Sequence, residues 1–142
     1  MKILLAVDGS KSALQAVDSL IEHAEWYRDR PTVELVTVHP PVPRLPGLSK
    51  LVSKAQLQQY YKEEGEAQLA EAKKMLEDAG IDYESRVLVG PAAEILVAHA
   101  KAKRCDMIFI GSRGMGAARN LLLGSTVTKV LQLAGVPVLV AR

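Results

Sequence analysis

Cysteine is nearly absent from this chain, since Cys105 is the only one among 142 residues. A single cysteine excludes a disulfide within the chain and is typical of proteins from a reducing compartment. Only three histidines occur, and neither Cys105 nor His39 has a second ligand candidate at metal-binding spacing. We therefore expect a cytoplasmic protein without a metal site of its own.

Charge of one sign and long apolar runs are also lacking. The 18 Lys and Arg residues are interleaved with 16 Asp and Glu residues, which leaves a net charge of +2 and no basic stripe for a phosphate backbone. Trp26, Tyr60 and Tyr61 are too few and too separated to form a base-stacking platform. The apolar run that opens the chain is too short for the core of a signal peptide or for a membrane span. Neither a nucleic acid nor a membrane is therefore an expected partner.

What the chain does have is the composition of one ordinary globular domain. Its 49% of hydrophobic residues can fill a sizeable core, and its 24% of charged residues keep the surface soluble. A length of 142 residues leaves no comfortable room for a second unit. We therefore expect a single domain that spans residues 1–142.

Short apolar runs alternate with helical patterns along the whole chain. The run from Ile3 to Val7 is continuous, as expected for a strand buried on both faces of a parallel sheet. After Ser10, a good N-cap, apolar residues recur at helical spacing. The same reasoning predicts strands over 3–7, 33–38, 83–89, 107–110 and 137–141, and helices after Ser10, over 53–79, after Gly90 and over 125–133. Such alternation is typical of a Rossmann-like α/β fold, an open parallel sheet with right-handed crossovers and helices on both faces.

Several polar residues on these elements have an ordinary structural interpretation. The charges from Lys62 to Asp78 are typical of the solvated face of a long helix. His23 and His99 fall on predicted helices and are interpreted as packing or surface residues. Cys105 is expected to be a small buried residue.

The segment after the fourth predicted strand is rich in glycine and ends where a helix begins. In an open parallel sheet, ligands bind beyond the carboxyl ends of the strands, so this segment lies where a ligand is expected. Glycines there, such as Gly111 and Gly114, let backbone N–H groups approach phosphate oxygens because no Cβ intervenes. Gly124 and Ser125 add the free N–H groups of a helix N-terminus and a hydroxyl. The pattern therefore indicates a phosphate site.

Two well-known phosphate loops are excluded by spacing. The chain contains no G-x-x-x-x-G-K-[ST], so it is not a P-loop NTPase. Gly111, Gly114 and Gly116 read G-x-x-G-x-G, which is the wrong order for a dinucleotide fingerprint. They also follow the fourth predicted strand, whereas that fingerprint follows the first.

Gly111, Gly114, Gly124 and Ser125 form the pattern G-x2-G-x9-G-[ST], which resembles the signature of the ATP-binding branch of the universal stress protein family. The resemblance extends over essentially the whole chain. It implies an adenine nucleotide α-hydrolase-like fold with the strand order 3-2-1-4-5. Further similar segments are 3–10, 36–38, 90–95 and 105–108.

The resemblance implies a nucleotide site with named roles. Asp8, at the end of the first strand, would lie by the ribose, and Val38, near the end of the second, would pack on adenine. The residues alone support two roles for Asp8 equally: contact with the ribose, and capping of the helix that follows Ser10.

The same resemblance distributes the phosphate contacts over the glycine-rich segment. Gly111 and Gly114 would approach the sugar and the phosphates, and Gly124 with Ser125 would hold the phosphates. Thr126 stands where many relatives carry valine, and its backbone is expected to serve equally well. The implied ligand is ATP, with Mg²⁺ or Mn²⁺ as a possible bridge between phosphates.

Three classes of function remain open: a nucleotide-dependent regulatory module of the stress response, a slow ATPase or phosphotransferase, and a dimeric interaction scaffold without nucleotide. Phosphoryl transfer needs charge clamps and a group that orients the nucleophile, and the motif offers only backbone amides and a hydroxyl. No catalytic residue is therefore predicted, although weak ATP hydrolysis stays compatible with the motif. The intact glycines favour the regulatory module, whose downstream protein partner the sequence does not identify.

The last predicted strand suggests how the chain assembles. Residues Val138–Ala141 are apolar, and at a sheet edge they would expose unpaired backbone groups. The resemblance implies that this edge pairs with the same strand of a second chain. We therefore expect a homodimer.

Overall fold

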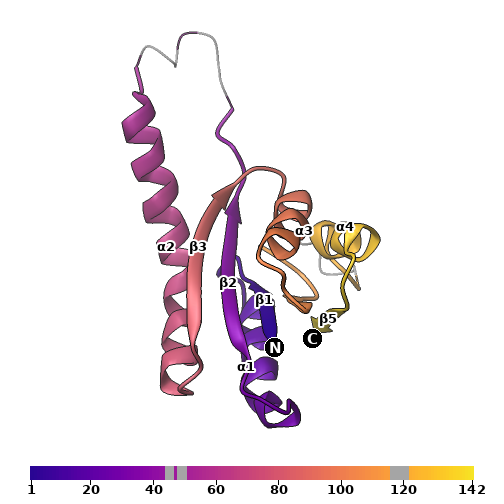
Figure 1. Cartoon of the computed structure of the whole chain (residues 1–142). Coiled ribbons are helices and arrows are strands. Elements are labelled where there is room, and N and C mark those ends of the chain that lie inside the picture. Colours follow the sequence, from indigo (N-terminus) through magenta and orange to yellow (C-terminus); the bar gives the residue numbers. More distant parts are fainter. Residues whose placement is uncertain (44–46, 48–50, 116–121) are drawn as a thin grey trace.

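Five parallel strands form one open sheet at the centre of the computed structural model, which describes residues 1–43, 47, 51–115 and 122–142 (Figure 1). Their order across the sheet is β3-β2-β1-β4-β5, which confirms the expected fold class and strand order. The strands are β1 (Lys2–Ala6), β2 (Thr32–His39), β3 (Tyr83–Val89), β4 (Met107–Gly111) and β5 (Val138–Ala141). The helices are α1 (Lys11–Glu22), α2 (Lys54–Asp78), α3 (Ala92–Ala102) and α4 (Ser125–Leu133).

Strand β1 holds the centre of the sheet because it pairs in parallel with β2 on one side and with β4 on the other. Its residues Ile3, Leu4 and Leu5 are completely buried. A strand with a neighbour on each edge and helices over both faces meets no water, which explains its continuous apolar sequence.

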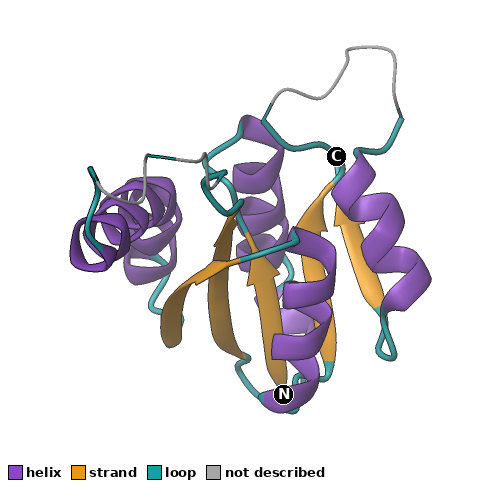
Figure 2. Cartoon of the chain, turned by 90° about the horizontal axis from the view of Figure 1, so that it is seen from above, coloured by secondary structure: helices purple, strands orange, loops and turns teal. Residues whose placement is uncertain are grey.

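Helices cover both faces of the sheet (Figure 2). Successive residues of a strand point to opposite faces, so Leu5 and Leu35 pack in one core and Leu4 and Val36 in the other. The first core also contains side chains of α1 and α2, and the second contains side chains of α3 and α4. Helices α1 and α2 therefore cover one face of the sheet, and α3 and α4 cover the other.

The helix ends follow from local sequence. Ser10 caps α1, because its Oγ accepts a hydrogen bond from the Ala13 N–H at 3.2 Å. Ser53 and Gln56 form a capping box at the start of α2, and Gly80 follows its end with a φ of +64°. A short 3-10 helix over Ala24–Trp26 was not predicted. Within the described ranges, no helix is both long and apolar enough to cross a membrane.

Glu34 is a fully buried carboxylate in the interior of β2. Its Oε1 lies 2.9 Å from Lys2 Nζ and 3.7 Å from Lys103 Nζ, and its Oε2 lies 3.1 Å from His99 Nε2. The interpretation of His99 as a simple packing or surface residue was therefore incomplete, because its ring contacts a buried charge.

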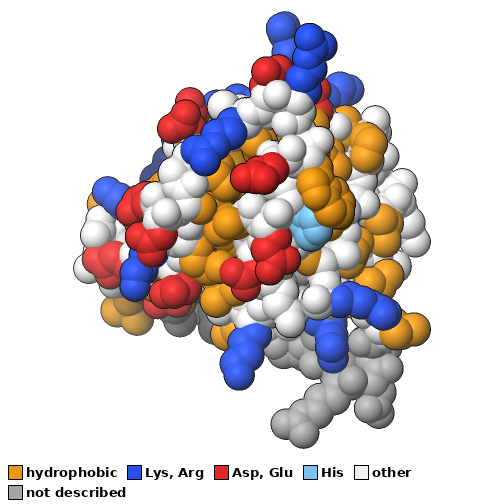
Figure 3. Space-filling model, turned by 90° about the horizontal axis from the view of Figure 1, so that it is seen from below, with side chains coloured by type: hydrophobic (Ala, Val, Ile, Leu, Met, Phe, Trp, Pro, Cys, Tyr) orange, Lys and Arg blue, Asp and Glu red, His pale blue; other side chains and the backbone are white. Residues whose placement is uncertain are grey.

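The face seen from below carries both signs of charge with hydrophobic side chains between them (Figure 3).

Desolvation by burial raises the pKa of the Glu34 carboxyl most strongly, but its basic partners together outweigh that effect. Hydrogen bonding to Lys2 and His99, together with the charges of Lys2 and Lys103, lowers the pKa below its ordinary value. A carboxyl with a lowered pKa in the folded state adds stability above its unfolded pKa. That stability is lost as the pH falls through the folded pKa.

We expect acid to destabilise the wild-type protein more than a Glu34→Gln variant. Glutamine cannot titrate, so the variant lacks the part of the pH dependence that begins below the ordinary carboxyl pKa of about 4.5. Urea unfolding at pH values from 7 down to 3 measures the difference. Glu71→Gln is the control, because Glu71 is an exposed glutamate on α2 and is not among the ion-pair partners of Lys2, His99 or Lys103. Parallel pH profiles for wild type and Glu34→Gln would contradict the assignment.

Candidate functional site

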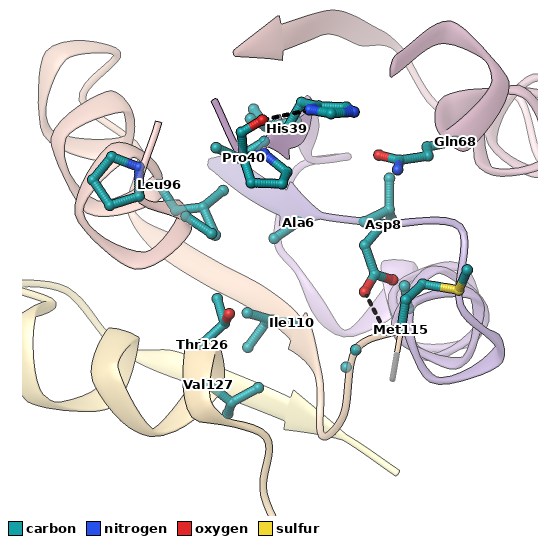
Figure 4. A pocket seen from close by; sticks show the side chains of 18 of the residues that line it. Ala6, Asp8, His39, Pro40, Gln68, Leu96, Ile110, Met115, Thr126 and Val127 are labelled. Atoms are coloured by element: carbon teal, nitrogen blue, oxygen red, sulfur yellow. Dashed lines mark hydrogen bonds between the residues drawn. The ribbon is translucent and has the colours of Figure 1, made fainter. Parts of the chain in front are cut away.

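A pocket of about 700 Å³ opens at the carboxyl ends of the strands (Figure 4). It is lined by residues that end β1, β2 and β4 and by residues that begin α3 and α4. The strand order places β2 on one side of β1 and β4 on the other, so the chain leaves β1 at the point where the order reverses. This switch point is where open α/β sheets bind their ligands.

Most of the residues predicted for the site come together in this pocket. Gly124 and Ser125 are not among its lining residues, but they directly precede Thr126 at the start of α4. Gly116 lies outside the described residues. The predicted residues that line the pocket are Asp8, Val38, Gly111, Gly114 and Thr126.

Asp8 connects two loops that meet at the switch point. Its Oδ1 accepts a hydrogen bond from the Ser10 N–H at 3.0 Å, and its Oδ2 accepts one from the Met115 N–H at 2.8 Å. Ser10, rather than Asp8, supplies the side-chain cap of α1. The carboxylate therefore shapes the turn after β1 and fastens the loop after β4 to it. A carboxylate has about four lone-pair positions, so Asp8 can still accept further hydrogen bonds.

The first half of the glycine-rich loop, residues 111–115, is held by the starts of two helices. The Arg113 N–H donates to Ser12 Oγ at 3.1 Å, and Ser12 Oγ lies 3.4 Å from Ser112 Oγ. At the other end, the Gly124 N–H donates to the Ser112 carbonyl at 2.8 Å. The start and the end of the loop are thus joined directly, which brings the glycines and the first turn of α4 to one place.

Two glycines of the motif are required by packing, independent of any ligand. A Cβ at Gly111 would lie 2.3 Å from the carbonyl oxygen of Ser12, and a Cβ at Gly114 would lie 2.7 Å from Asp8 Oδ2. Gly124 is different, because a Cβ there would meet only ordinary contacts, the nearest at 3.5 Å from the Arg113 Cα. The sequence pattern had indicated these glycines for phosphate approach and gave no sign of their packing role.

The pocket has an apolar wall and a polar wall. Figure 4 shows Leu96, Ile110 and Val127 on one side, and Asp8 and Gln68 on the other. Leu96, Ile110 and Val127 are each buried. Pockets that combine apolar walls with a few placed polar groups are typical of small-molecule sites.

Two helices begin at the pocket without a side-chain cap. The N-cap of α3 is Pro91 and that of α4 is Gly124, and neither makes a side-chain hydrogen bond to its helix. The first N–H groups of a helix have no partner within it, and they carry a partial positive charge. By contrast, Ser10 and Ser53 cap α1 and α2. The pocket therefore offers backbone donors to an anion at the start of α4.

Sequence reasoning missed the part of the site that α2 supplies. Gln68 lines the pocket from α2, a helix for which the sequence had given only its charges an interpretation, as a solvated face. It also missed Leu96 of α3 as part of the apolar wall. No local pattern distinguishes either residue from its neighbours, because both reach the pocket only through helix packing. Among the residues that the structure describes, no group of three or more His, Cys, Asp or Glu side chains is placed to hold a metal ion.

The fold and the pocket define the class of protein: an open parallel α/β sheet with its pocket where the strand order reverses. Comparison with known proteins then defines the family. The model of the universal stress protein family matches residues 1–142. The chain belongs to the universal stress protein family.

Individual relatives match nearly the whole of this chain. Universal stress protein MJ0531 of Methanocaldococcus jannaschii is 33% identical over 142 residues, which cover 99% of this chain and 81% of the relative. Among solved structures, protein MJ0577 superposes with a TM-score of 0.81 at 28% identity and covers 99% of this chain and 94% of its own. A universal stress protein solved in complex with cAMP has a TM-score of 0.73 at 26% identity and covers 100% and 97% of the two chains.

Proposed function

We propose that this protein binds ATP in the pocket between β1 and β4 and acts as a nucleotide-dependent regulatory module of the stress response. The observation that carries the proposal is the meeting of Asp8, Val38, the first glycines of the motif and the start of α4 around one pocket. All 142 residues are proposed to act as one unit, in the cytoplasm. The downstream partner would read the nucleotide state of the module.

The apolar wall suits an adenine ring. Val38 lines the pocket at the end of β2, and Leu96 and Ile110 line it from α3 and β4. A flat aromatic base gains free energy by leaving water for such a surface. Asp8, on the polar wall, would then accept hydrogen bonds from the ribose. The solved complex of a related universal stress protein with cAMP supports an adenine nucleotide as the class of ligand.

The second half of the motif suits the phosphates. Gly124 begins α4, and the N–H groups of Ser125 and Thr126 lie in its first turn, where helices bind anions. The short Gly124 to Ser112 hydrogen bond brings these donors beside Gly114. A triphosphate is proposed because both halves of the loop offer backbone donors, and Mg²⁺ or Mn²⁺ would bridge its oxygens.

Efficient hydrolysis is not part of the proposal. Among the described residues that line the pocket, the titratable side chains are Asp8, His39 and Arg113. Asp8 is assigned to the ribose in this proposal rather than to the phosphates, and His39 Nδ1 lies 2.6 Å from the Pro40 carbonyl. Phosphoryl transfer needs a free group that orients the nucleophile. ATP turnover is therefore expected to be slow, and binding is the proposed activity.

The freshly purified protein is expected to release ATP when it is denatured, or to bind ATP when it is titrated. Chromatography with mass spectrometry identifies a released nucleotide, and calorimetry measures binding by the emptied protein with and without Mg²⁺. A protein that releases no nucleotide and does not bind ATP would overturn the proposal. The dimeric interaction scaffold would then be the leading function.

Gly124→Val is expected to weaken ATP binding at least tenfold, which corresponds to about 1.4 kcal/mol. The branched side chain would stand between the two halves of the loop, where the phosphates must approach. Gly135→Val is the matched control, because a Cβ at Gly135 meets no atom within 4 Å. Calorimetry compares the two variants, and thermal unfolding verifies that both are folded. Equal ATP affinities of folded Gly124→Val and wild type would mean that the phosphates bind elsewhere.

The proposed homodimer follows from a difference between the two sheet edges. Strand β3 carries the exposed ion pair of Glu84 and Arg86, and charges of this kind discourage edge-to-edge pairing. Strand β5, at the other edge, reads Val-Leu-Val-Ala without a charge. On the neighbouring α4, Leu131 and Leu133 are each 45% exposed. We assign the dimer contact to Val138–Ala141 for this reason.

Light scattering at micromolar concentration is expected to give twice the mass of one chain. Val138→Lys, which places a charge on β5, should shift the protein toward the monomer, and thermal unfolding verifies that the variant is folded, because Val138 also packs against the second core. Val89→Lys on β3 is the control and should leave the dimer intact, since it alters only the opposite edge. A wild-type protein that is monomeric under these conditions would contradict the dimer.

A further inference from the structure

Gln68 stands on the polar wall of the pocket and is the one residue of α2 in the described lining. We infer that its side-chain amide, oriented by Thr37, binds a ribose hydroxyl and makes the site selective for ribonucleotides. The inference rests on the proposed nucleotide function and adds a specificity-determining residue to it.

The carbonyl end of the Gln68 amide is already engaged. Thr37 Oγ1 donates a hydrogen bond to Gln68 Oε1 at 2.6 Å, and Thr37 is completely buried in β2. A buried hydroxyl without an acceptor is costly, so this contact fixes the orientation of the amide. The amide nitrogen must then point the other way. Figure 4 shows it directed toward the side of the pocket where Asp8 lies.

The Gln68 amide nitrogen is a pure donor that no described residue satisfies. Among the described residues, none accepts a hydrogen bond from Gln68 Nε2. The amide offers two N–H donors and no acceptor on that atom. A ligand group that binds it must therefore present a lone pair. A hydroxyl oxygen meets this need.

Backbone packing keeps Gln68 next to Asp8. A Cβ built on Gly9, the residue after Asp8, would lie 3.6 Å from both the Cα and the Cγ of Gln68. The helix can come this close because Gly65, one turn earlier, has no side chain, and a Cβ there would clash with Val87 at 2.2 Å. The position of Gln68 is thus set by the close approach of α2 to Gly9 and to the Val87 side chain of β3.

Asp8 and Gln68 together match the chemistry of a ribose hydroxyl. A hydroxyl donates one hydrogen bond and also accepts, the Asp8 carboxylate only accepts, and the Gln68 amide nitrogen only donates. A hydroxyl between them binds both groups, whereas a deoxy sugar leaves the Gln68 amide nitrogen without an acceptor and Asp8 with only its two backbone hydrogen bonds. Sites built to bind a hydroxyl reject analogues that lack it for this reason.

The test compares three nucleotides: ATP, 2′-deoxy-ATP and 3′-deoxy-ATP, each titrated into wild type and Gln68→Met. Methionine keeps the length and the helix propensity of glutamine and removes the amide. We expect wild type to prefer ATP over one deoxy analogue. Gln68→Met should weaken ATP binding about two- to tenfold, the effect of one neutral hydrogen bond, and leave the affinity for that analogue unchanged.

Two further variants separate ligand recognition from a structural effect. Gln59→Met is the matched control, because Gln59 lies on the same helix, donates to Glu63 and is absent from the described pocket lining. It should bind all three nucleotides as wild type does. Thr37→Val keeps Gln68 but removes the hydroxyl that orients its amide. Like Gln68→Met, it should reduce the preference for ATP over the deoxy analogue.

The outcomes distinguish this inference from the proposed function. If Gln68→Met weakens all three nucleotides equally, or leaves ATP binding unchanged, the role in selectivity is overturned and ATP binding stands. If wild type binds none of the three nucleotides, both the proposed function and this inference are overturned.

Discussion

The parallel pairing of β1 with β2 on one edge and β4 on the other is the constraint on which the rest of the molecule depends. It covers both edges of β1, while helices cover its two faces, and the strand order reverses where the chain leaves β1. The carboxyl ends of β1 and β4 are thereby brought together, and the loops that follow them must meet. Asp8 and the glycine-rich loop lie at this junction, so the position of the pocket is a consequence of strand order.

The same residues support the fold and the proposed site. Asp8 fastens the loop after β4 through the Met115 N–H, and Gly111 and Gly114 allow that loop to lie against α1 and against Asp8. A substitution at Gly111 or Gly114 would therefore disturb loop packing as well as a ligand. Gly124, where a Cβ meets only ordinary contacts, separates the two effects.

The polar groups at the two ends of the sheet differ in whether they are paired within the protein. Toward the amino ends, Glu34 is fully buried, and Lys2, His99 and Lys103 surround its carboxylate. At the carboxyl ends, backbone N–H groups and the Gln68 amide face a pocket. The first arrangement pairs a buried charge with basic side chains of the protein and is structural. The second keeps donors available for a ligand.

Local sequence patterns were enough for the fold class and for the glycine-rich part of the candidate site, whereas the strand order was expected from the family resemblance. Apolar runs and helical periodicity predicted the elements, and the glycine spacing predicted a loop that the structure places at the switch point. The sequence by itself determined these features because each depends on residues close together in the chain. Only the tertiary structure decided that Glu34 pairs with His99 and that Thr37 orients Gln68. Those contacts join segments far apart in sequence, and only the packing of helices on the sheet brings them together.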